Sequence, residues 1–190
     1  MVGAVEPITG IPRSLLDLFS CIGLGATEED FWRWPGEVGT FVQSHTWEAY
    51  RYSGILVMRS YSRVDSQTLI ASNDEDVSSH ADAIAVNRIL SSIDAVYGAK
   101  ACGVASDEAI PHNIAYPLFV AGSQSRVIVQ HVAWKETIRS KFQDLIQSDR
   151  YWQTEKIFDL LQDAWESWDA GQISDPFEMA AERGLELGLL

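Results

Sequence analysis

The chain of 190 residues has few of the features from which disulfide-bonded or membrane proteins are built. Its two cysteines, Cys21 and Cys102, are too few for a disulfide scaffold. The first residues show neither the basic nor the apolar region of a secretory leader, so we expect an intracellular protein, in the cytoplasm or the nucleus. The longest apolar run, from Ile114 to Gly122, is far shorter than the roughly 20 residues that span a bilayer, which predicts no membrane contact.

Positive charge is also scarce. The chain has 14 Lys and Arg residues against 27 Asp and Glu residues, which gives a formal net charge of −13. Lysine occurs only at positions 100, 135, 141 and 156. A domain that binds the phosphates of nucleic acid needs a cluster of Lys and Arg side chains on its surface. The sequence therefore disfavours direct binding to nucleic acid.

The usual catalytic motifs are missing from the sequence. It contains no GxGxxG, P-loop, HExxH, CxxC or GxSxG pattern, and its four histidines are isolated from one another. The acidic triplet Asp74, Glu75 and Asp76 could in principle hold magnesium, but carboxylates at a helix start usually pair with exposed backbone N–H groups. We therefore expect no bound metal and no cofactor.

Apolar residues recur with the helical period along most of the chain, which predicts an all-α fold. Two short helices are expected before residue 36, a long one from Thr40 to Arg63, and another from Val77 that ends at Gly98. Residues 99–113 lack periodicity and are expected to form a long loop. The sequence thus predicts a single α-helical domain over residues 1–190, a bundle or orthogonal array of about seven helices.

Helix signals continue in the C-terminal half. Residues 127–145 carry an apolar stripe that favours one helix, although 126–132 alone could also be read as a strand. Thr154 is expected to cap the next helix, and Gly171 to close it. Asp175, Pro176 and Glu178 follow the pattern of N-cap, first helical residue and third helical residue of a last helix.

Three side chains are candidates for proton transfer or for polarising a carbonyl. His131 lies between Val127 and Trp134 on the predicted apolar stripe, and a buried neutral imidazole there could donate or accept a proton. The alternative is a hydrogen-bonded core histidine without catalytic role. Tyr50 and Tyr116 are the further candidates, as hydroxyl donors.

Aromatic residues are numerous, with seven tryptophans and six tyrosines. Each of them could simply belong to the core. Together, however, such side chains can line a cavity for a flat apolar molecule. The residues expected to contact such a ligand are Trp47, Tyr50, Phe119, Trp134 and Trp165.

The segment Tyr116–Gly122, with the sequence YPLFVAG, resembles the Pro-Leu-Phe-Ile-Ala-Gly helix of the fungal-specific transcription factor regulatory domain. The segments at 8–16, 47–56 and 160–169 resemble further helices of that family in the same order. The resemblance implies an α-helical fold of fungal origin that, in some relatives, senses a small apolar molecule. In the family, a DNA-binding zinc cluster held by six cysteines precedes this domain. The present chain has two cysteines and resembles the C-terminal half of the regulatory domain without the zinc cluster.

The chain departs from the family pattern at two places. After Gly122 the family often continues with Cys-Glu, where this chain has Ser123 and Gln124, and Phe177 replaces the family's usual tryptophan in the last helix. If the family's Glu makes a structural contact, an amide fills that role here or the role has disappeared.

Two functions are open at this point. The first is a stand-alone ligand-binding or regulatory domain that acts through a protein partner, as a homodimer or with a related transcription factor. The second is a cofactor-free enzyme of secondary metabolism, a cyclase or isomerase such as a Diels–Alderase, that holds an apolar metabolite in an aromatic pocket.

Overall fold

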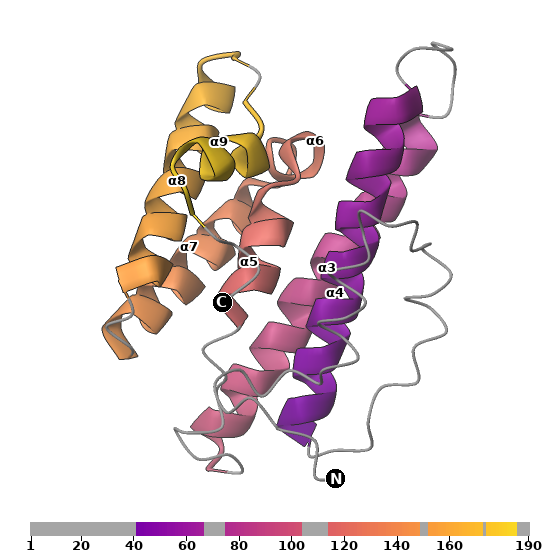
Figure 1. Cartoon of the computed structure of the whole chain (residues 1–190). Helices are drawn as coiled ribbons and strands as arrows, with labels where there is room; N and C mark the ends of the chain where they lie inside the picture. The colour runs from indigo at the N-terminus through magenta and orange to yellow at the C-terminus, as the bar shows by residue number, and fades with distance from the viewer. Residues whose placement is uncertain (1–40, 67–74, 104–113, 149–151, 173, 186–190) are drawn as a thin grey trace, which may run out of the picture.

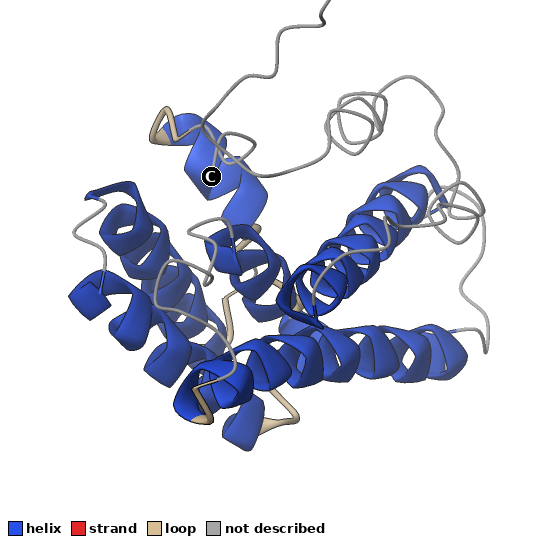
Figure 2. Ribbon diagram, turned by 90° about the horizontal axis from the view of Figure 1, so that it is seen from below, coloured by secondary structure: helices blue, strands red, loops and turns tan. Residues whose placement is uncertain are grey.

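The computed structural model describes residues 41–66, 75–103, 114–148, 152–172 and 174–185, and in these ranges it contains seven helices and no strand (Figures 1 and 2). The helices are α3 (Phe41–Ser66), α4 (Glu75–Ala101), α5 (Ala115–Gly122), α6 (Ser125–Ile128), α7 (Val132–Ser148), α8 (Trp152–Asp169) and α9 (Pro176–Glu182). The predicted all-α fold is thus confirmed. The helices expected before residue 36 lie outside the described residues, and the single domain over 1–190 stays a prediction.

Helices α3 and α4 form a long antiparallel pair along one side of the molecule (Figure 1). Their facing sides place Ile55 and Leu56 of α3 and Ile89 and Ile93 of α4 in the core. Burial of such side chains contributes about 1.5–3 kcal/mol each. Apolar faces, more than helix propensity, therefore hold the pair together.

Three buried polar side chains inside this pair, Thr46, Ser53 and Asp82, have partners. The hydroxyls of Thr46 and Ser53 are buried and donate to carbonyl oxygens four residues earlier in α3, at 2.9 and 2.8 Å. Asp82 of α4, whose side chain is only 2% exposed, forms an ion pair with Arg59 of α3 at 3.5 Å. The ion pair thus offsets part of the cost of burying the Asp82 charge.

Helix α5 lies between the α3–α4 pair and the group formed by α7, α8 and α9 (Figure 1). All its residues except Tyr116 are buried, as expected for a helix that is apolar on every side. It packs against α3, α4, α7 and α8. This short helix therefore joins the two halves of the described structure.

One continuous cluster of buried side chains draws residues from all seven described helices. Its bulk comes from large side chains with less than 2% exposure. These are Trp165, Phe119, Phe142, Leu56, Ile89, Ile93, Ile114, Leu118 and Ile128.

Two predicted helix ends are wrong. Helix α4 does not end at Gly98 but continues to Ala101. The buried Ala99 packs with Val42 and Val96, and this contact stabilises the additional helical residues. The residue in the left-handed region is Gly103, with φ of 69°. The described part of the expected loop therefore begins at Cys102, and residues 104–113 lie outside the described ranges.

Thr154 is also not a cap. Helix α8 begins at Trp152, which places Thr154 inside the first turn, where it is buried. Gly171, with φ of 77°, follows the end of α8 as predicted. The last helix begins as predicted too, since the Asp175 carboxylate accepts a hydrogen bond from the backbone N–H of Phe177 at 2.8 Å.

The helix expected over residues 127–145 is interrupted. Helix α6 ends at Ile128, residues 129–131 form a turn, and α7 begins at Val132. The run of β-branched residues from Val127 to Val129 has low helix propensity, which favours a break at this point. The later part of the stripe is confirmed, because Ile138, Phe142 and Leu145 are buried.

Candidate functional site

Two of the predicted site residues meet where α3 contacts α5. The rings of Tyr50 and Tyr116 stack with centroids 5.9 Å apart and an interplanar angle of 14°. Tyr50 is buried, whereas Tyr116 is partly exposed and is the one residue of α5 that is not buried. The stacked pair therefore extends from the interior toward the surface.

The environment of Tyr50 favours the protonated form of its phenol even more strongly than water does. Burial, and to a smaller extent the neighbouring Tyr116, raise the pKa of the Tyr50 phenol well above its ordinary value of 10.0. At neutral pH the phenol keeps its proton, so Tyr50 can donate a hydrogen bond but cannot act as a base.

The next turn of α5 packs against the last helix. Phe119 is fully buried and meets Phe177 edge to face, with centroids 5.2 Å apart. Phe177 thus supplies an aromatic contact where the resemblance led us to expect tryptophan. The Gln124 side-chain amide, which is buried, donates to the Val120 carbonyl at 3.1 Å, a bond that an ionised glutamate could not form.

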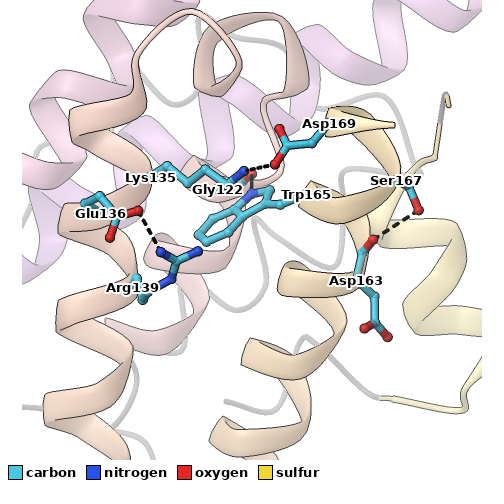
Figure 3. Close-up of polar contacts among 8 residues, drawn as sticks. All are labelled: Gly122, Lys135, Glu136, Arg139, Asp163, Trp165, Ser167 and Asp169. Atoms are coloured by element: carbon cyan, nitrogen blue, oxygen red, sulfur yellow. Dashed lines mark hydrogen bonds and ion pairs between the residues drawn. The ribbon is translucent and has the colours of Figure 1, made fainter. Parts of the chain in front are cut away.

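The C-terminal end of α5 is fixed to α8 by Trp165. The indole N–H of this buried tryptophan donates to the Gly122 carbonyl at 3.0 Å (Figure 3). At the same place the Leu161 side chain lies so close that a Cβ on Gly122 would come within 2.6 Å of its Cδ2. A larger residue at position 122 would therefore require Leu161 to change its side-chain conformation or the two helices to separate.

Two cations from α7 cover the same indole. Lys135 Nζ lies 5.5 Å and Arg139 Cζ 5.9 Å from the Trp165 ring centroid, distances at which a cation is attracted by the ring. Each cation also pairs with a carboxylate, Lys135 with Asp169 at 2.7 Å and Arg139 with Glu136 at 2.6 Å (Figure 3). These cations were not predicted from the sequence, although their spacing of four residues places both on one face of a helix.

The prediction that His131 points into the interior is wrong. His131 is exposed, lies in the turn that precedes α7, and stacks on the half-buried Trp134 with centroids 4.1 Å apart. The His131 carbonyl accepts hydrogen bonds from the backbone N–H groups of Trp134 and Lys135. His131 therefore directly precedes α7 and accepts its first hydrogen bonds. Because the helix breaks after α6, His131 does not lie on the apolar stripe, and its imidazole is not buried.

The remaining predicted contact residues do not converge on one place. Phe119 packs toward α9, Trp165 lies under the α7 cations, Trp134 lies below His131, and Trp47 is half-buried on α3. Among the predicted residues, the rings of Tyr50 and Tyr116 pair with each other, and so do the rings of His131 and Trp134. A role of any of them in binding or catalysis stays a prediction.

A second polar link, between α4 and α7, also went unpredicted. Lys141 of α7 pairs with Asp94 at 2.8 Å and lies 4.3 Å from the ring centroid of Tyr97, both on α4. Burial, and to a smaller extent Asp144, raise the pKa of Tyr97 to about 12.

This shift predicts a loss of stability at alkaline pH. An unfolded tyrosine ionises near pH 10, whereas folded Tyr97 keeps its proton to about pH 12. Its contribution is therefore complete below pH 10 and is lost as the pH rises from 10 to 12. We expect Tyr97→Phe to flatten the decline of unfolding free energy over this interval, as measured by urea titrations at several pH values. An equally steep decline in the variant would contradict the assignment.

The described residues place limits on other kinds of site. Within the described ranges no group of three or more His, Cys, Asp or Glu side chains is arranged to hold a metal ion. No helix in this part of the chain has both the length and the apolar composition needed to cross a membrane. Asp74 lies outside the described residues, and α4 begins at its neighbour Glu75.

The comparisons with known proteins identify a family. No curated protein and no solved structure matches the chain. The sequence model of the fungal specific transcription factor domain, however, matches residues 24–187. This match covers every described helix, including α5, whose sequence carries the resemblance noted above. Because the match spans most of the chain, the protein belongs to the fungal specific transcription factor domain family.

Proposed function

We propose that this chain is a regulatory domain that binds a small apolar molecule at the junction of α3 and α5 and acts through a protein partner, without contacting DNA itself. The observation that carries the proposal is the Tyr50–Tyr116 stack at this junction. The partner is a second copy of the chain or a related transcription factor. Family membership supports a site of action inside the cell, in the cytoplasm or the nucleus.

The stack suits an apolar ligand because its members differ in exposure. Tyr116 is partly exposed and Tyr50 is buried beneath it. A flat molecule that displaces the Tyr116 ring would gain a face of Tyr50 and meet a protonated phenol that can fix its orientation.

The position of α5 gives such binding a route to the rest of the domain. A ligand beside Tyr116 shifts a helix whose other contacts are Phe119 with Phe177 of α9 and Gly122 with Trp165 of α8. A packed core transmits small displacements because it leaves little room to absorb them. The effect of the ligand would thus appear on the outer helices α8 and α9, where a partner can sense it.

Charge supports action through a protein and not through DNA. The net charge of −13 repels phosphates. The cations Lys135, Arg139 and Lys141 of α7 already pair with Asp169, Glu136 and Asp94. We therefore expect no retarded band in a gel-shift assay of the purified chain with duplex DNA at physiological salt.

The ligand site is tested with the neutral probe 1-N-phenylnaphthylamine, whose fluorescence rises in apolar surroundings. We expect a saturable rise with the wild-type chain and an affinity about tenfold lower, about 1.4 kcal/mol, for Tyr116→Trp, whose larger ring occupies the proposed space. Tyr52→Trp is the matched control, because Tyr52 lies two positions from Tyr50, about 200° around the axis of α3. Circular dichroism verifies that the variants are folded.

Two results would reject the proposed site. One is the absence of a saturable fluorescence change with the wild-type chain. The other is an equal loss of affinity in Tyr116→Trp and Tyr52→Trp, which would show that the probe binds elsewhere or that both variants are merely loosened. Retardation of duplex DNA by the chain would reject the proposal that the domain does not contact DNA itself.

A further inference from the structure

Three side-chain contacts are spread along the length of α5. At its C-terminal end the Trp165 indole of α8 donates to the Gly122 carbonyl at 3.0 Å. In its middle the ring of Phe119 meets Phe177 of α9 edge to face, with centroids 5.2 Å apart. Its first turn carries Tyr116, whose ring is part of the proposed ligand site. The ligand site and the attachment to α8 therefore lie at opposite ends of α5.

The two ends of α5 are held unequally. At the C-terminal end the Gly122 carbonyl accepts from Trp165, whereas Ile114, at the N-cap, makes no side-chain hydrogen bond to the helix. A helix rises about 1.5 Å per residue, so Phe119 lies about 4.5 Å and Tyr116 about 9 Å along the axis from Gly122. A displacement of the first turn therefore turns α5 about its C-terminal end and also moves the ring of Phe119.

Helix α9 is a weaker support for α5 than the long helices are. It has seven residues, fewer than an isolated helix needs to persist in water, whereas α3, α4, α7 and α8 have 17 to 27. Its C-terminal end is held to α8 by the ion pair of Arg183 with Asp163, whose side chains are 44% and 50% exposed. Ion pairs this exposed contribute little to stability. The ring contact of Phe119 with Phe177 is therefore a support that a small ligand can overcome.

We propose that the contact of Phe177 with Phe119 restrains α5 in its ligand-free position and thereby lowers the affinity of the site at Tyr116 for its apolar ligand. A ligand that enters beside Tyr116 turns α5 about Gly122 and separates the two phenylalanine rings. Binding must then offset the free energy of the ring contact, so the contact opposes binding. This inference rests on the proposed function, because it concerns the regulation of the same site.

The same coupling makes α9 the output of the site. Coupling between two equilibria is reciprocal, so a ligand that is opposed by the ring contact weakens that contact by the same factor. A bound ligand therefore loosens α9 from α5. A partner protein that binds the loosened α9 would in turn raise the affinity for the ligand.

Titration with phenylnaphthylamine tests the restraint in the variant Phe177→Leu, which keeps an apolar side chain but removes the ring pair. We expect this variant to bind the probe about three- to tenfold more tightly than the wild type, because the ring contact no longer opposes binding. Phe158→Leu is the matched control, since Phe158 of α8 stacks on Phe142 of α7 with centroids 5.1 Å apart. We expect the control to keep the wild-type affinity.

The gain of affinity must arise at Tyr116 and not in space left beside α9. Tyr116→Trp is therefore combined with Phe177→Leu. We expect the double variant to bind the probe about tenfold more weakly than Phe177→Leu, the same loss that is expected for Tyr116→Trp alone. A double variant that keeps the full gain would show that the probe binds beside α9, and the restraint would be wrong.

Hydrogen exchange followed by mass spectrometry measures the restraint without a ligand. We expect the backbone amides of α5 to exchange about three- to tenfold faster in Phe177→Leu than in the wild type, because exchange requires a local opening that the ring contact opposes. In Phe158→Leu we expect a smaller change in α5. Circular dichroism and urea titration verify that the variants are folded.

Three results would overturn the proposal: an unchanged probe affinity in Phe177→Leu, equal gains of affinity in Phe177→Leu and Phe158→Leu, or equal acceleration of α5 exchange in these two variants. If Tyr116→Trp weakens probe binding while Phe177→Leu changes neither affinity nor exchange, the restraint is wrong and the proposed ligand site stands. If neither the wild type nor any variant binds the probe, the ligand site itself is wrong and the restraint on it fails as well.

Discussion

Replacing Trp165 with alanine is expected to lower the free energy of unfolding by about 3–5 kcal/mol. The side chain is 1% exposed and is part of the continuous core cluster. Its removal leaves a cavity, takes the hydrogen-bond donor from the Gly122 carbonyl, and exposes the inner side of Lys135 and Arg139. Urea denaturation followed by circular dichroism measures the loss.

Trp165→Phe separates these contributions. Phenylalanine keeps most of the apolar volume but cannot donate to Gly122, so we expect a smaller loss of about 1–3 kcal/mol, the cost of an unsatisfied buried acceptor. Trp134→Ala, at a half-buried position, should cost less than Trp165→Ala. Equal losses at positions 134 and 165 would show that the complete burial of Trp165 and its hydrogen bond to Gly122 add nothing to stability.

Replacing Gly122 with alanine is expected to cost about 1–3 kcal/mol, because it overpacks the contact between α5 and α8. The new Cβ would meet Leu161 Cδ2 at 2.6 Å, Cδ1 at 3.2 Å and Cγ at 3.3 Å. Leu161 is fully buried and cannot swing into solvent. Either Leu161 adopts a less favourable conformation in the packed core or the two helices separate, and separation would strain the hydrogen bond from Trp165 as well.

Gly98→Ala is the matched control for this substitution. Gly98 lies inside α4, and an added Cβ there meets nothing within 4 Å. Alanine has the higher helix propensity, so this variant should gain up to about 1 kcal/mol. Combining Gly122→Ala with Leu161→Ala should cost less than the sum of the two single losses, because the shorter side chain makes room for the Cβ. Strict additivity, or a neutral Gly122→Ala, would contradict the close approach.

The consequences of both substitutions meet at α5. This helix stacks Tyr116 on Tyr50, packs Phe119 against Phe177 and receives the hydrogen bond of Trp165. A ligand at the first contact and a mutation at the last therefore act on the same helix. The Gly122→Ala variant should consequently also alter phenylnaphthylamine binding if the proposed ligand site is correct.

Local signals predicted much of the helical structure. The apolar period predicted α3, α4 and α8, and the sequence Asp175-Pro176 predicted the start of α9, where the carboxylate accepts from the Phe177 N–H. Such signals succeed because a cap or an amphipathic face depends on residues within one or two turns. They failed at Gly98 and Thr154, where burial of neighbouring side chains outweighed the preference of a single residue.

The break before His131 had the largest effect on the candidate site. The sequence contains both an apolar stripe that favours one helix and a β-branched run that weakens it, and periodicity alone does not decide between them. The turn at residues 129–131 moved His131 from the expected interior to the surface and exposed Val129 and Val132. The loss of a candidate acid–base group and the exposure of the two valines thus have the same cause.

By itself, the sequence determined the helical class, the acidic charge and the resemblance to the fungal family, because composition, period and motif order are properties of the chain alone. Only the tertiary structure decided which side chains meet. Tyr50 lies 66 positions from Tyr116 and Trp165 lies 43 positions from Gly122. Contacts at such separations depend on how helices cross and how closely they approach, and these follow from the packing of the whole core.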